Sequence, residues 1–352
     1  MQRLPLLVAA ISVSSCATLA HRGGQEAGTA EKKRRSGPKV ELDASIASIV
    51  SSNPFRYSDS DLDDFDDEDG EGQRFDGLES EWDVITTVEG GADLEWKVAK
   101  GRELQLSLGA EHNAFLMNSI GDYSAFEVRL AYDFTRDDRA KLRIGHVPDR
   151  FKKNYKLPSG EFDAAEYQQD TIGIEYEHEF EGDWSVGIGF EAYERDFNTE
   201  FDSRDRDADT VFVNTELELT DKLEVGLEIA MATVDTDTER RSGILIDRSF
   251  ESLAFEPTVK TEVGDWELEI SVRLSEREYT TDERADDGRF DRVDDKTRLR
   301  LRATRDLAID GGETFWILGW RENDADLSDP TVPADETGHE EITFGLGFRF
   351  SF

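Results

Sequence analysis

The residues that decide the fold are the last eleven of the chain, Ile342-Thr343-Phe344-Gly345-Leu346-Gly347-Phe348-Arg349-Phe350-Ser351-Phe352. Every second residue is large and apolar, and the residues between them are small or polar. This period of two predicts a β-strand with one apolar face and excludes an amphipathic helix. An edge strand of a secreted sandwich is the alternative, but an edge that exposes four phenylalanines would favour aggregation.

The same alternation recurs back to residue 40, in segments of about ten residues, which is the length of a membrane-spanning β-strand. We predict about 14 strands, within a range of 12–16. Short connections near 100–101, 136–139, 181–183, 220–222, 264–265 and 306–312 alternate with long ones near 51–81, 117–123, 148–165, 195–208, 235–247, 279–292 and 322–340. This order predicts an all-β, antiparallel up-and-down barrel with both termini at the end of the short turns.

The opposite face of these segments carries charges in rows, such as Glu175, Glu177 and Glu179. A soluble β-protein would bury its apolar face instead. A closed wall that is apolar outside and charged inside suits lipid around it and water within it. This arrangement also explains a mean hydropathy of −0.61 in a chain without the roughly 18 consecutive apolar residues of a membrane-spanning helix.

The closing strand resembles that of Gram-negative outer-membrane β-barrels, which ends in an aromatic residue preceded by apolar residues at alternate positions. The resemblance implies a transmembrane barrel over residues 39–352, in contact with outer-membrane lipid and lipopolysaccharide. It also implies that the barrel assembly machinery reads Phe348, Phe350 and Phe352, that the termini are periplasmic and that the long loops are extracellular. No particular barrel family is indicated.

The N-terminus reads as an export signal over residues 1–20, because Arg3 precedes an apolar stretch from Leu4 to Val13. Val13-Ser14-Ser15-Cys16 resembles a bacterial lipobox, so lipidation of Cys16 and ordinary cleavage after Ala17 or Ala20 are both open. Residues 21–38 are polar and basic and predict a flexible periplasmic tether.

Composition excludes several classes of function. A net charge of −39 repels the backbone of nucleic acids, so we expect no nucleic-acid partner. The single cysteine excludes an internal disulfide framework and multi-cysteine metal sites. None of the five histidines belongs to a recognisable nucleophile motif or to a paired-histidine metal site, so we expect no enzyme activity and no cofactor.

The predicted lumen contains the main candidate site, a ladder of Lys296, Arg298, Arg300 and Arg302 on one strand. Antiparallel pairing is expected to bring Glu269 and Glu267 of the preceding strand roughly alongside Arg300 and Arg302. Arg129 and Arg143 also face inward, and inward glycines such as Gly189 and Gly347 leave room for water or for a loop. Two interpretations stay open: ion pairs that brace the wall, or charged walls that orient solutes in a pore.

The loops are acidic, with nine carboxylates among the thirteen residues from Asp59 to Glu71. Asp67, Asp69 and Glu71 approach the spacing of a calcium loop, but its twelfth position holds Leu78 instead of a bidentate glutamate. A solvated outer loop and loose ion binding are the two interpretations. The predicted function is a porin-like channel for small hydrophilic solutes; the alternative is a non-conducting surface barrel with cation-binding loops, for adhesion or envelope structure.

Overall fold

The computed structural model of the chain describes residues 37–58, 61–62, 65, 75–157, 161–181, 183–241, 244–281, 289–326 and 338–352. The predicted signal peptide, Cys16, nearly all of the tether, and Asp67, Asp69 and Glu71 lie outside these residues. The first strand begins at Lys39 and belongs to the barrel.

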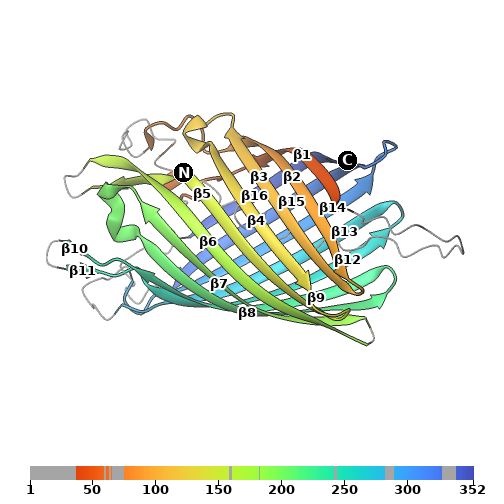
Figure 1. Cartoon of the computed structure of the whole chain (residues 1–352). Coiled ribbons are helices and arrows are strands. Elements are labelled where there is room, and N and C mark those ends of the chain that lie inside the picture. Colours follow the sequence, from red (N-terminus) through yellow and green to blue (C-terminus); the bar gives the residue numbers. More distant parts are fainter. Residues whose placement is uncertain are drawn as a thin grey trace, which may run out of the picture.

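Fourteen antiparallel strands form one closed barrel, which confirms the predicted fold class (Figure 1). Neighbours in sequence are neighbours in the wall, and β1 closes on β16. The barrel strands are β1 (Lys39–Ser51), β2 (Asp83–Ala99), β3 (Arg102–Phe115), β4 (Tyr123–Asp133), β5 (Asp138–Lys156), β6 (Phe162–Phe180), β7 (Trp184–Phe197), β8 (Arg206–Thr220), β9 (Leu223–Thr236), β12 (Phe250–Val263), β13 (Trp266–Tyr279), β14 (Val293–Asp306), β15 (Gly312–Asp326) and β16 (His339–Ser351).

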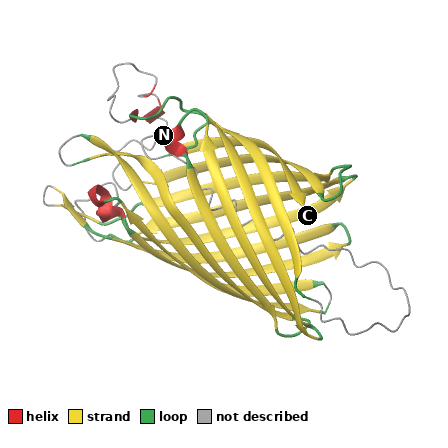
Figure 2. Cartoon of the chain, turned by 45° about the horizontal axis from the view of Figure 1, so that its top comes forward, coloured by secondary structure: helices red, strands yellow, loops and turns green. Residues whose placement is uncertain are grey.

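The two ends of the barrel differ. Short turns join the strands at the end that holds the C-terminus, and Gly101, Gly264 and Gly311 adopt positive φ there, at 70°, 65° and 70°. The opposite end, called the long-loop end below, carries the 3-10 helices η3 (Ser119–Gly121) and η4 (Thr199–Arg204) and the hairpin of β10 (Glu239–Arg241) and β11 (Ile244–Ile246) (Figure 2). None of the helices among the described residues has the length and apolar character to cross a membrane.

The predicted long loop over residues 148–165 is wrong, because β5 and β6 continue as a paired ladder to Lys156 and Phe162. Residues 157–161 alone connect them. The apolar alternation stops near His146, so the pattern indicates a loop where the strand continues. Strand pairing depends on hydrogen bonds between backbone groups, so two strands can stay paired where their outer face carries no apolar side chains. Two register shifts, at Val147/Arg150 and Phe151/Lys153, mark β-bulges in this extension of β5.

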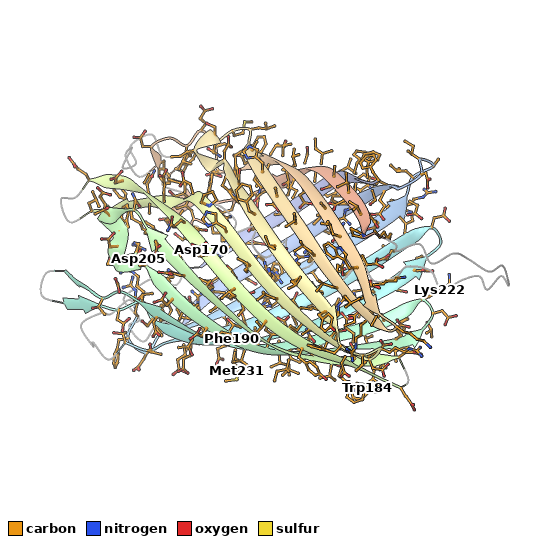
Figure 3. The ribbon with its side chains drawn as sticks, in the orientation of Figure 1. Asp170, Trp184, Phe190, Asp205, Lys222 and Met231 are labelled. Atoms are coloured by element: carbon orange, nitrogen blue, oxygen red, sulfur yellow. The ribbon has the colours of Figure 1, made fainter. Side chains whose placement is uncertain are left out.

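The outer face of the wall is apolar. Met231, Phe190 and Trp184 project away from the barrel (Figure 3), and the side chain of Met231 is 65% exposed. On the closing strand, Ile342, Phe344 and Phe348 are exposed while Gly345 and Gly347 are buried. The apolar side chains therefore face the surroundings and the charged ones face the lumen, as the alternation predicts.

Aromatic rings gather on the outer face near the short turns. Trp184 stacks on Phe180 with a centroid distance of 4.1 Å, and Tyr132 packs against Phe134 at 4.9 Å. Such rings occupy the level of the lipid headgroups in transmembrane barrels.

A buried apolar cluster lies inside the barrel at the long-loop end. Phe55 and Tyr57, from the connection after β1, are fully buried and pack with wall residues that include Ile85, Phe115 and Phe151. The rings of Phe55 and Phe115 stack at 5.6 Å. The first long connection thus folds against the inner wall.

Candidate functional site

The predicted ladder exists on β14, with glutamates of β13 beside it. Glu269 lies opposite Arg302, Ser271 opposite Arg300, and Glu267 opposite Thr304. The glutamates therefore lie roughly alongside the arginines, as the sequence predicts, but as diagonal neighbours: Arg300 is two residues from the position opposite Glu269, and Arg302 is two residues from the position opposite Glu267. Residues 280–292 connect β13 to β14. A connection of this length contains no tight turn that would fix the strand register, so the exact cross-strand partners cannot be read from the sequence.

Arg298 belongs to a chain of ion pairs along the wall. Its Nη2 contacts both carboxylate oxygens of Glu256, at 2.9 and 3.1 Å, although Glu256 stands two strands away on β12. Glu256 also contacts Arg273 at 2.8 Å, and Arg273 contacts Glu228 at 3.2 Å. Here the bracing interpretation accounts for the charges.

The opposite wall has similar pairs. Arg143 contacts Glu127 at 2.5 Å and Glu191 at 3.1 Å, and Arg129 also pairs with Glu127. Lys141 contacts Glu177 at 2.6 Å. These partners lie on the same or nearby strands, so the pairs run along the wall.

Arg302 is buried and stacks on an inward aromatic ring. Its guanidinium carbon lies 4.7 Å from the centroid of the Phe315 ring. That ring in turn covers Gly347 of the closing strand, and Phe212 covers Gly189 in the same way. The expectation that these glycines leave room for water or a loop is wrong at both positions, because a neighbouring ring fills the space.

Like charges lie directly opposite each other near both ends of the inner wall. Towards the short turns, glutamates face glutamates across neighbouring strands, as at Glu218–Glu224 and Glu262–Glu267. Towards the long-loop end, arginines face arginines, at Arg195–Arg206 and Arg298–Arg321. Like charges in directly opposed positions destabilise a sheet. Opposite charges nearby offset part of this cost: Lys260 contacts Glu224 at 2.6 Å, Lys222 contacts Glu262 at 3.2 Å, and Glu256 contacts Arg298 at 2.9 Å.

Sequence reasoning missed several cations at the long-loop end, among them Lys152, Arg206 and Arg277. Lys152 and Arg206 fall in segments that the pattern indicates as loops. Arg277 continues the inward parity of Arg273 on β13, and extending that parity would have identified it.

No metal centre is found in the part of the chain that the structure describes: no three His, Cys, Asp or Glu side chains group there in a way that would hold an ion. The weak calcium candidates lie outside that part.

No protein family matches the chain, and no curated protein does. The chain is similar in structure to the outer membrane channel DcaP of Acinetobacter baumannii, with 10% identity and a TM-score of 0.46 over 92% of this chain and 100% of that one. It is also similar to OmpT, an outer membrane protein of Vibrio cholerae, with 11% identity and a TM-score of 0.45 over 92% and 100%. For an anion-selective porin from Comamonas acidovorans, the identity is 10% and the TM-score 0.42, over 90% and 99%. Likeness at this level says nothing about what this chain binds or transports.

Proposed function

We propose that the chain is an outer-membrane channel for passive diffusion of small hydrophilic solutes, with periplasmic termini and extracellular long loops. The observation that carries the proposal is the inner wall, where charged side chains recur on strands around the barrel while apolar ones face outward. Lipid and lipopolysaccharide would surround such a wall. Phe348, Phe350 and Phe352 would present the signal for the assembly machinery, and the proposal includes no catalytic step.

The size of the barrel supports this proposal. Eight-stranded barrels fill their interior with side chains, whereas barrels of 16–18 strands leave an aqueous channel. Fourteen strands lie close to the second class. The ion pairs of Arg298 and Arg143 run along the wall and hold these side chains beside it. Both features favour a water-filled interior.

One observation favours the alternative, a non-conducting surface barrel. Phe55 and Tyr57 enter the barrel and bury their rings against the inner wall at the long-loop end. A loop that packs in this way narrows the entrance. The acidic connections would then serve cation binding, adhesion or envelope structure.

The test is single-channel conductance of the refolded chain in a planar bilayer. Steady ohmic steps support the channel, and silence from a correctly folded barrel favours the surface protein. A Phe55→Ala/Tyr57→Ala variant removes the rings that narrow the entrance and is expected to raise the conductance. Its matched control is Leu116→Ala/Met117→Ala, which truncates two exposed apolar side chains of the next long connection and should leave conductance unchanged.

A further inference from the structure

Three lumen cations at the long-loop end have no carboxylate partner among the described residues: Lys152 on β5, Arg206 on β8 and Lys296 on β14. We call them the basic cluster. All three are half-buried. They differ in this respect from Arg143, Arg273 and Arg298, which pair with glutamates deeper in the barrel.

The register explains why these cations stay unneutralised. Arg206 lies opposite Arg195, whose guanidinium donates to the Gln169 side-chain oxygen at 3.0 and 2.6 Å. Lys296 lies between the neutral partners Ser275 and Asn323. Lys152 is the extra residue of the bulge between Phe151 and Lys153, and bulges change the direction of a side chain.

The side chains of the three cations extend into one region of the lumen, although their strands lie apart in the wall. β5 and β14 stand opposite each other in the closed strand order, and β8 lies between them. Arg206 nevertheless repels both Lys152 and Lys296. His339 on β16 also lies within the field of both lysines. The cations therefore face one another across the interior.

Other charged groups border the cluster. Arg150, Lys153, Arg277 and Arg292 add positive charge. Asp294 acts on Lys296, but it contacts Arg292 at 2.6 Å and Arg277 at 4.0 Å. Glu341 likewise lies 3.8 Å from Arg321. Asp61 of the first long connection contacts Lys153 at 3.1 Å. Cations outnumber these carboxylates in this region within the described ranges.

Several donors around the cluster are buried without an acceptor in the described part of the chain. They are Nε of Arg206, Nε of Arg277 and Nη2 of Arg150. Arg150 is only 2% exposed, and its guanidinium stacks at 4.1 Å on the Tyr123 ring. Buried donors in proteins are almost always satisfied, so this set indicates a missing acceptor.

We propose that the basic cluster binds a multivalent oxyanion, such as a phosphate group or a polycarboxylate, and that solutes of this class are those the channel takes up. Guanidinium and ammonium groups are the donors that phosphate and carboxylate prefer. The chain as a whole carries −39 charges, so the general field of the protein does not attract anions. Attraction must come from this local group. The transport part rests on the proposed function, whereas binding does not.

The test measures binding and conduction separately on the full refolded chain. Calorimetric titration in detergent uses inorganic phosphate, pyrophosphate and citrate, with sucrose as the neutral probe. The variant is Lys152→Gln/Arg206→Gln/Lys296→Gln. The control is Lys39→Gln/Lys100→Gln/Lys222→Gln, which removes the same charge at the short-turn end, where Lys222 is visible in Figure 3. Reversal potentials in a salt gradient provide the second readout.

We expect the wild-type chain and the control to bind the oxyanions, and the cluster variant to bind them at least about tenfold more weakly. Tighter binding of phosphate and pyrophosphate than of citrate would identify phosphate groups as the preferred ligand, and the reverse order would identify polycarboxylates. Binding without conductance supports the cluster and overturns the channel. If the barrel conducts but none of the three proteins binds the oxyanions detectably, the proposed anion site is overturned and the proposed channel function stands. Oxyanion binding of equal strength in the wild type and the cluster variant overturns the proposal, because the anion would then bind elsewhere.

Discussion

The ring of Phe315 on β15 lies over Gly347 on β16, its direct cross-strand partner. The contact lies on the lumen side of the closing strand, because Gly347 alternates with the outward-facing Leu346 and Phe348. A ring that covers a glycine in this way adds packing where the strand itself has no side chain. The glycine is therefore a packing requirement of the inner wall.

Gly347→Val is expected to lower the free energy of unfolding by about 1 to 3 kcal/mol, because the new side chain overlaps the Phe315 ring. Urea unfolding of the barrel in lipid vesicles, followed by tryptophan fluorescence, measures this change. Gly109→Val is the matched control, since a Cβ there meets only the Glu127 Cβ at 4.0 Å. Equal destabilisation by both substitutions would contradict the role of the Phe315 contact. Phe315→Ala should restore part of the loss caused by Gly347→Val.

The alternation of the closing strand was sufficient to predict which side chains face lipid. Phe344 and Gly345 occupy opposite faces as expected, because in a β-strand the face is set by local parity alone. The pairing of Glu269 with Arg302 was not predictable in the same way. Thirteen residues separate β13 from β14, so no short turn fixes the register of this strand pair. Several alternative registers would also place charged side chains opposite one another on the inner face, so the charge pattern does not select one.

The basic cluster could not be predicted from the sequence, for a different reason. Lys152 acquires its position from a bulge, and Arg206 from a strand that begins before its apolar alternation starts at Val211. The burial of Phe55 depends on a connection packing against four separate strands, which no local pattern encodes. Sequence periodicity describes the belt of the barrel, whereas its long-loop end is determined by tertiary contacts.

Glu256 connects Arg273 and Arg298 and is expected to stabilise the wall. Glu256→Gln removes the charge that neutralises two arginines, and we expect the free energy of unfolding to fall by about 1 to 2 kcal/mol. The same urea titration measures it. Glu262→Gln is the control, because Glu262 pairs with Lys222 on the exposed rim, and its loss should change stability by less than about 0.5 kcal/mol. A loss as small for Glu256 as for Glu262 would argue against bracing.

The deeper ladder is expected to influence ion selectivity. Replacing Arg298, Arg300 and Arg302 by Ser removes three positive charges from the lumen and leaves Glu256 and Glu269 in place. If the barrel conducts, its preference for cations should rise, and the reversal potential in a KCl gradient should shift accordingly. An unchanged reversal potential in a folded, conducting variant would show that the ladder only braces the wall.

The like-charged pairs near the two ends of the inner wall predict an asymmetric current. Glutamates oppose glutamates near the short turns, as at Glu218–Glu224, and arginines oppose arginines towards the long-loop end, as at Arg195–Arg206. With basic and acidic walls in series, one polarity of voltage accumulates mobile ions in the lumen and the other depletes them. Currents at equal and opposite voltages should therefore differ. The difference should be larger at about 0.1 M salt, where the Debye length is about 10 Å, than at about 1 M, where it is about 3 Å. Lys152→Gln/Arg206→Gln/Lys296→Gln should reduce the asymmetry at low salt. Symmetric currents at both salt concentrations would show that the two charged walls do not act on the same conducting path.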